Sequence, residues 1–209
     1  MDVVGTLNAG FKRLPPWPLC VLGVLPVLWL FYRAVIGDLG VDPVKRIEHQ
    51  MGLWGLWLVI AGLSITPLCR LAGLRLMKYR RAIGLLTFFY ILVHLLVWLV
   101  LDVQILSEIW KDILKRPYIT IGMAAFVLMI PLALTSNNWS VRKMGAAVWC
   151  KLHKLTYAVA ILGSVHFVML VKGWQVEPLI YLVVILTLLA LRLDIFQRRP
   201  GQAQRSAKA

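Results

Sequence analysis

The clearest shortage in this 209-residue chain is of acidic side chains. It has 9 Asp and Glu against 23 Lys and Arg, and charged residues of both signs make up only 15% of it. Soluble domains carry more charge, and disordered chains are far less hydrophobic. Here 60% of the residues are hydrophobic, which excludes disorder and argues against an ordinary soluble domain.

Cysteine is also scarce, and the common catalytic motifs are missing. Cys20, Cys69 and Cys150 form neither a C-x-x-C-H motif nor a cluster, which excludes covalent c-type haem attachment and an iron–sulfur centre. The sequence has no P-loop, dinucleotide-binding glycine motif, zinc-protease motif or nucleophile elbow. If electrons come from NAD(P)H, another protein must therefore collect them.

Long apolar segments account for the hydrophobic composition. Each approaches the roughly 20 residues that a membrane-spanning helix needs, and each is too long for a strand of a membrane β-barrel. They cover residues 17–36, 50–69, 82–101, 118–135, 148–171 and 178–193. The sequence predicts an all-α integral membrane protein, with one six-helix transmembrane domain over residues 1–209 and a flexible tail at 199–209. The first segment lacks a convincing cleavage site and is predicted to be a retained helix.

The distribution of basic residues predicts the orientation of these helices. With six spans, 16 of the Lys and Arg fall on the side that holds both termini, and 7 fall on the other. The positive-inside rule then places both termini in the cytoplasm. The outer side also carries seven acidic residues, so the whole net charge of +14 belongs to the cytoplasmic face. On a soluble protein the same charge would indicate nucleic-acid binding, but this placement favours membrane orientation.

Histidines are the conspicuous polar residues within the apolar segments. An ionisable side chain inside a bilayer is costly and is a functional-site candidate by default. His94 lies about 13 residues from the inner edge of the third span, and His166 lies about 13 residues outward from His153, which is roughly 20 Å in each case. We therefore expect His94 and His166 at one level in the outer half, as the axial pair of one b-type haem. The alternative is that each histidine is a hydrogen-bonded packing residue.

A second haem is expected on His153, about 20 Å nearer the cytoplasm. An ideal helix would place His153 and His166 about 140° apart, so they share a face only if the helix is irregular near Gly163 or begins after His153. No second histidine is available at the inner level. Five-coordinate iron, a non-histidine ligand and the absence of an inner haem all stay open.

Three further residues near the helix ends have two interpretations each. Arg80 and Arg81 are either interfacial anchors or partners for haem propionates or a flavin phosphate. His49 lies at the outer end of the second span, beside Glu48. We expect it to pair with Glu48 or to cap its helix. A role as a metal ligand is the less favoured alternative.

Eight stretches of the chain match a known family. They are Gly40-Val-Asp-Pro-Val-Lys-Arg-Ile-Glu-His49, Ile65-Thr-Pro-Leu-Cys-Arg70, Arg80-Arg-Ala-Ile-Gly-Leu85, Arg116-Pro-Tyr-Ile-Thr-Ile-Gly122, Leu134-Thr-Ser136, Arg142-Lys-Met-Gly145, Trp149-Cys-Lys-Leu-His153, and Pro178-Leu-Ile-Tyr181 through Leu189-Ala-Leu-Arg192. On these residues the chain resembles the MsrQ (YedZ) family, the haem-binding membrane subunits of the bacterial periplasmic methionine sulfoxide reductase system.

The resemblance implies a six-helix, ferric-reductase-like domain of the bacterial inner membrane that binds b-type haem and FMN. It implies electron transfer from a cytosolic flavin reductase, or from quinol, to the periplasmic molybdenum-containing methionine sulfoxide reductase MsrP, which repairs oxidised proteins. His94, His153 and His166 match the family's haem-associated histidines, and Arg80 and Arg81 match its paired arginines. Ferric reductases and NADPH oxidases resemble the chain more distantly. They usually carry four haem-ligating histidines on two helices, and this chain lacks the inner one on its third span.

Two other functions stay open at this point. A stand-alone ferric or other metal reductase would use the same haems but would need no protein partner. A non-redox transporter or haem-handling scaffold would bind its substrate transiently on the histidines. The sequence lacks the inverted repeat and the pair of broken helices that many transporters have.

Overall fold

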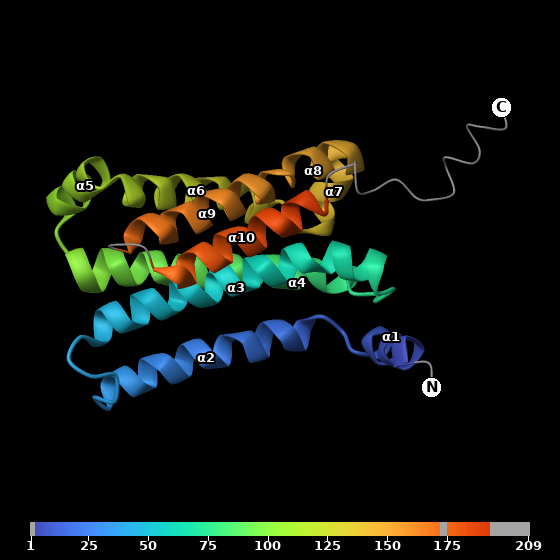
Figure 1. Ribbon diagram of the computed structural model, residues 1–209, viewed down its shortest axis with the longest axis horizontal. Helices are drawn as coiled ribbons and strands as arrows, with labels where there is room; N and C mark the ends of the chain where they lie inside the picture. Colours follow the sequence, from blue (N-terminus) through green and yellow to red (C-terminus); the bar gives the residue numbers. More distant parts are fainter. Residues whose placement is uncertain (1–2, 172–174, 193–209) are drawn as a thin grey trace.

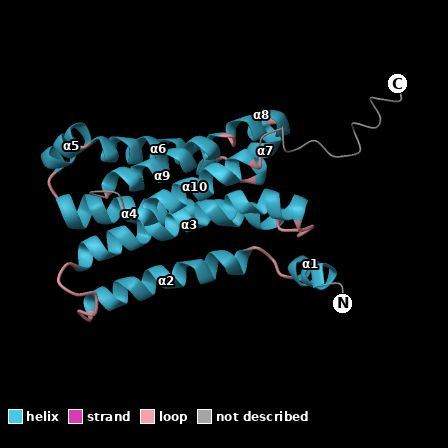
Figure 2. Ribbon diagram, viewed as in Figure 1, coloured by secondary structure: helices cyan, strands magenta, loops and turns pink. Residues whose placement is uncertain are grey.

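The computed structural model describes residues 3–171 and 175–192, without the side chains of residues 106–109. All regular structure in these ranges is helical (Figure 2). Five described segments are long and apolar enough to cross a membrane, and a shorter apolar helix, α10 (Val176–Ala190), runs beside them (Figure 1). The five are α2 (Trp17–Val35), α3 (Pro43–Leu71), η1 (Met77–Tyr79) with α4 (Arg80–Val97) and η2 (Trp98–Val103), α6 (Pro117–Leu134), and α8 (Ala146–Leu152) with α9 (Leu155–Leu170). The predicted all-α membrane bundle is confirmed, while residue 193 of the last predicted span and the tail at 199–209 lie outside the described residues.

Three short helices were not predicted. They are α1 (Val3–Arg13), α5 (Leu106–Lys115) and α7 (Asn138–Met144). Helix α1 lies across the end of the bundle instead of along it (Figure 1). Asn8 ties it to the loop after α3, because its Nδ2 donates to the carbonyl of Gly73 (3.0 Å) and its Oδ1 accepts from the Arg75 amide (2.8 Å). Each of these helices is too short to appear as an apolar run of membrane length.

Local sequence signals fix several helix ends. The Asp42 side chain accepts a hydrogen bond from the Lys45 amide (3.1 Å) and Pro43 follows it, so α3 begins with a side-chain cap and a proline in its first turn. Asn137 caps α7 in the same way, and Gly145 ends it with a φ of +79°. These signals place the turns between the long helices at the two ends of the bundle.

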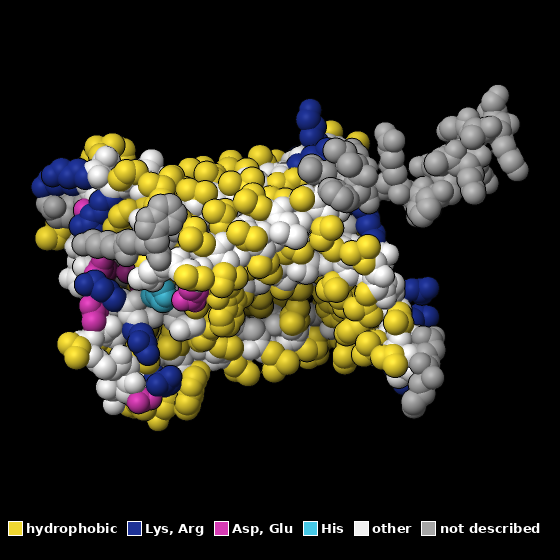
Figure 3. All heavy atoms as spheres, in the orientation of Figure 1, with side chains coloured by type: hydrophobic (Ala, Val, Ile, Leu, Met, Phe, Trp, Pro, Cys, Tyr) yellow, Lys and Arg dark blue, Asp and Glu magenta, His cyan; other side chains and the backbone are white. Residues whose placement is uncertain are grey.

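The surface of the bundle is that of a membrane protein. Hydrophobic side chains cover its middle. Lys and Arg gather at both ends, while Asp and Glu are seen only toward the left end of the view (Figure 3). Large side chains such as Leu28 and Trp29 on α2 are about 60% exposed, which only a lipid environment makes favourable. Met51, Leu63 and Ile185 are among the fully buried side chains of the interior.

Helix α3 is held to the end of α10 by an arginine. Pro67 lies inside α3 and has no N–H, so the carbonyl of Leu63 lacks its usual partner in the helix. Arg192 is 8% exposed, and its Nη2 donates to the carbonyls of Leu63 (2.7 Å) and Gly62 (3.2 Å). This bond satisfies the acceptor that the proline leaves unpaired.

The helices pack as two antiparallel pairs around the predicted site. Helix α3 packs along α4, and α6 packs along α9, with α10 against α9 and α3. Each pair runs from the outer end predicted from the charges to the inner end and back. The space between the two pairs is the region where His94 and His166 were expected.

Candidate functional site

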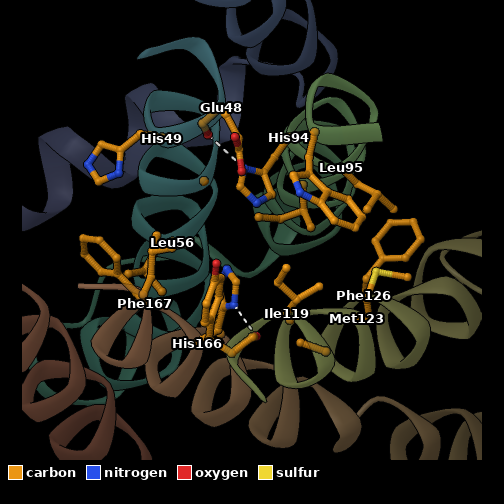
Figure 4. A pocket seen from close by; sticks show the side chains of 18 of the residues that line it. Glu48, His49, Leu56, His94, Leu95, Ile119, Met123, Phe126, His166 and Phe167 are labelled. Atoms are coloured by element: carbon orange, nitrogen blue, oxygen red, sulfur yellow. Dashed lines mark hydrogen bonds between the residues drawn. The ribbon is translucent and has the colours of Figure 1, made fainter. Parts of the chain in front are cut away.

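A cavity of about 370 Å³ lies between α3, α4, α6 and α9, and we call it the outer cavity. Its size lies within the usual range of small-molecule and cofactor pockets. His49, His94 and His166 line it together with apolar side chains that include Leu56, Met123, Phe126 and Phe167 (Figure 4).

The His94 ring is held by the backbone of the neighbouring helix. Its Nδ1 lies 2.8 Å from the carbonyl oxygen of Glu48 on α3. A carbonyl can only accept, so Nδ1 carries the proton and Nε2 keeps its lone pair. One turn after Glu48, Gly52 makes room for the ring, because a Cβ there would lie only 3.2 Å from Nδ1.

His166 is held by an equivalent arrangement on the other helix pair. Its Nδ1 lies 2.7 Å from the carbonyl oxygen of Tyr118 on α6, and four residues later Gly122 makes room for the ring. A Cβ at Gly122 would lie 2.8 Å from Nδ1, which is closer than real contacts allow. Nε2 of His166 therefore also keeps its lone pair.

The two rings face one another across the cavity (Figure 4). Their centroids are 6.4 Å apart, and their planes cross at 78°. Two histidine–metal bonds of about 2 Å each, with about 1.2 Å from each nitrogen to its ring centre, require almost the same separation. A backbone carbonyl on the second ring nitrogen is the usual support of a metal-ligating histidine. The pair is therefore chemically suited to hold an iron centre between its Nε2 atoms.

Gly163 also lines this cavity, one turn before His166. A Cβ at Gly163 would meet no atom within 4 Å, so it borders open space and does not touch the ring. His49 lies on the other side of the cavity, with its ring centroid 5.7 Å from that of Phe167, and its side chain is exposed. The structure thus separates His49 from the facing histidine pair.

Arg80, Arg81 and His153 come together at a second cavity of about 670 Å³, which we call the inner cavity. His153 lies in a break between α8 and α9, so the possibility that the fifth membrane helix restarts after His153 is the one found. Its ring stacks on Trp149 at a centroid distance of 3.8 Å, and its Nε2 lies 3.1 Å from Oγ1 of Thr135.

The two inner arginines have different surroundings. Arg81 is exposed, and its Nη1 donates to Oδ1 of Asn138 on α7 (2.7 Å). Arg80 is partly buried in the wall of the inner cavity. Lys78 and Arg192 line the same cavity, so its charged lining residues are all cationic.

Sequence reasoning predicted both histidines of the facing pair but missed what supports them. Gly52 and Gly122 were not singled out, and neither were the carbonyls of Glu48 and Tyr118. A backbone carbonyl has no sequence signature. The detectable signal was a glycine inside a long apolar helix, at positions where its low helix propensity needs a packing explanation.

Comparison with known proteins places the chain in a family. Residues 50–164 match the family model described as "Ferric reductase like transmembrane component". A protein of Brucella anthropi named "Protein-methionine-sulfoxide reductase heme-binding subunit MsrQ" is 49% identical over 178 residues, which cover 85% of this chain and 80% of that protein. Proteins of the same name from Brucella ovis and Brucella melitensis are 51% identical over 179 residues, with the same coverage. No solved structure matches the chain.

The matched region contains the third and fourth spans. It includes His94 and His153 but not His49 or His166. The matches to the Brucella proteins extend over most of the remaining chain. Both comparisons agree with the predicted family and with a multi-span membrane protein. The chain belongs to the MsrQ family and carries its ferric-reductase-like transmembrane domain.

Proposed function

We propose that this protein is a b-type haem electron-transfer subunit of a methionine sulfoxide reductase system, in the bacterial inner membrane. His94 and His166 are the axial ligands of one haem in the outer cavity. The observation that carries this proposal is the facing pair itself: two rings 6.4 Å apart, each held through Nδ1 by a backbone carbonyl. The names of the Brucella relatives, which describe a heme-binding subunit of a reductase, support it.

The chain's own contribution to this function is positional. The two carbonyls fix the ring tautomers, and the glycines let the rings lie close to the helices. Apolar side chains around the cavity exclude water and provide a medium of low dielectric. The haem, when bound, supplies the one-electron redox chemistry.

The inner cavity is the proposed place of a second cofactor. It is larger, His153 lines it, and Arg80 and Arg81 provide cations for an anionic group. A second b-type haem would use His153 as its single histidine ligand, which requires Nε2 to leave Thr135 or Nδ1 to bind instead. FMN would use the arginines for its phosphate. Haem and flavin stoichiometry on the purified protein distinguishes two haems from one haem with one flavin.

The proposed electron path crosses the membrane from the cytoplasmic side. The basic inner end would receive a cytosolic flavin reductase, or quinol would deliver electrons from the bilayer. The outer end would deliver them to MsrP, the periplasmic molybdenum-containing subunit that reduces oxidised methionine. The excess of basic residues on the side of the membrane predicted to hold both termini supports this orientation.

Haem spectra of ligand variants test the axial pair. We expect a b-type band in the reduced-minus-oxidised spectrum of the purified protein. His94→Ala and His166→Ala should each abolish the same haem, because each removes one of its two proposed axial bonds to the protein. His153→Ala is the matched control and should leave this haem in place. Full haem content in both of the first two variants would contradict the proposed ligation.

Partner dependence tests the place in the reductase system. Reduced protein should transfer electrons to the periplasmic reductase and so reduce methionine sulfoxide, while ferric chelates should be poor acceptors. Rapid reduction of ferric chelates without any periplasmic subunit would instead identify a stand-alone metal reductase.

A further inference from the structure

The outer cavity has one apolar end and one charged end. Its deep wall is made of Val59, Met129 and Val159, which lie well inside their helices. Among the described residues, charged side chains line it only where helices begin or end, near the outer surface. These are Lys45, Glu48, Asp102 and Arg116.

Two of these groups are cations from different helix pairs. Lys45 lies in the first turn of α3, and its Nζ is 3.3 Å from a carboxylate oxygen of Asp42. Arg116 directly precedes α6, with Nε 3.3 Å from a carboxylate oxygen of Asp112 and Nη1 3.3 Å from the Tyr118 hydroxyl. Both side chains are more than half exposed, so they retain hydrogen-bonding capacity.

A b-type porphyrin carries both of its carboxylates on one edge. A carboxylate without a partner in an apolar environment is very costly, so that edge cannot lie against the wall formed by Val59, Met129 and Val159. Arg80 and Arg81 line the inner cavity and not the outer one. The only Lys and Arg among the described residues that line the outer cavity are Lys45 and Arg116.

We infer that Lys45 and Arg116 form a carboxylate-binding subsite that holds the propionate edge of a porphyrin at the outer end of the cavity. The inference rests on the proposed haem site between His94 and His166. Both residues already form ion pairs at the outer end of the cavity, Lys45 with Asp42 and Arg116 with Asp112. Charge-assisted hydrogen bonds from an ammonium and a guanidinium to carboxylates are the chemistry involved.

The acidic neighbours make these cations more important. Glu48 and Asp102 line the same end of the cavity. Two added carboxylates would face these acids, and only Lys45 and Arg116 among the described lining residues offset the repulsion there. The bound edge would then point toward the outer side of the membrane, where the proposed partner accepts electrons.

Binding of haemin and of its dimethyl ester to the full-length, haem-free protein tests the subsite. The ester has the same ring and iron but no free carboxylates. Lys45→Gln with Arg116→Gln should weaken the binding of haemin by about tenfold or more, while binding of the ester stays as in the wild type. Unchanged ester binding also demonstrates that the double variant is folded.

Arg46→Gln is the matched control, because Arg46 adjoins Lys45 on α3 but does not line the cavity. It should bind both probes as the wild type does. Equal losses for haemin and ester in the double variant, or no loss for either, would overturn the subsite. Failure of the proposed haem site is a separate result, in which neither probe gives a six-coordinate b-type spectrum with the wild-type protein.

Discussion

Gly52 and Gly122 determine where the two histidine rings can lie. An α-helix normally surrounds its carbonyls with side chains, but beside a glycine a neighbouring ring can approach the backbone. Here each ring does so and donates to the carbonyl one turn earlier. The glycines therefore fix ring position, and through it ring protonation.

Alanine at these glycines should disturb the rings to different degrees. At Gly122 the added Cβ would lie 2.8 Å from Nδ1 of His166, and at Gly52 it would lie 3.2 Å from Nδ1 of His94. Overpacking of this kind costs about 1–3 kcal/mol. We expect Gly122→Ala to lower haem affinity more than Gly52→Ala, measured by titration of haem-free protein.

Gly62→Ala provides the control on α3. Its Cβ would meet Ile83 at an ordinary 3.6 Å, so outer haem binding should not change. Equal haem affinity in Gly122→Ala and the wild type would contradict the role of the glycine.

At the residue scale, His94 and His166 could be predicted because an ionisable group in an apolar run is conspicuous. Their supports could not be predicted, because a backbone carbonyl carries no sequence signal. The supports also come from residues 46 and 48 positions away along the chain.

At the scale of elements, the pairing of Pro67 with Arg192 joins two helices distant in sequence. Arg192 supplies the hydrogen bond that the proline removes from the Leu63 carbonyl. The guanidinium also lies over the ring of Tyr157, with its Cζ 5.6 Å from the ring centroid, where the face of the ring attracts a cation. The buried Arg192 side chain is thus stabilised by the carbonyls of Gly62 and Leu63, which accept its hydrogen bonds.

A double-mutant cycle should detect this coupling. Arg192→Met should destabilise the protein by about 2 kcal/mol, because it leaves a buried carbonyl unpaired. In a Pro67→Ala background the same change should cost less, since the alanine has a backbone N–H that can donate to the Leu63 carbonyl. Unfolding in detergent, followed by circular dichroism, measures both costs. Equal costs in the two backgrounds would exclude the coupling.

The long helices could be predicted from apolar length, and a restart of the fifth span after His153 was one of two possibilities that the sequence left open. The π-helical end of the third span was not predicted. The break at His153 lies among the polar residues Lys151, His153 and Lys154, and η2 ends the apolar run of the third span and includes Asp102. The His153 ring stacks on Trp149, which lies one turn earlier in the chain, and contacts Thr135 at the end of α6. The contact with Thr135 becomes visible only when the helices are placed together.

At the scale of the whole molecule, charge placement predicts which end faces the cytoplasm. The N-terminal helix α1 and helices α7 and α8 lie at the same end of the bundle (Figure 1), as an alternating topology requires. Membrane orientation itself stays a prediction from the distribution of Lys and Arg.

Thiol labelling of intact cells should establish the orientation. Cys150 is exposed at the predicted inner end, and Val41 is fully exposed in the predicted outer loop. With Cys20 and Cys69 replaced by serine, a membrane-impermeant reagent should leave Cys150 unlabelled until the membrane is permeabilised. In a background that also lacks Cys150, Val41→Cys should label at once. The reverse pattern would invert the proposed orientation.

The two helix pairs position their histidines in the same way. In each pair a glycine makes room for the ring, and the carbonyl four residues before that glycine accepts a hydrogen bond from the ring. On the proposed ligation, an iron between them would have two electronically matched ligands. Such a centre has no intrinsic preference for receiving electrons from one side or the other. The direction of electron flow would then be set by the unlike ends of the molecule, one strongly basic and one of balanced charge, and by the proteins that each end admits.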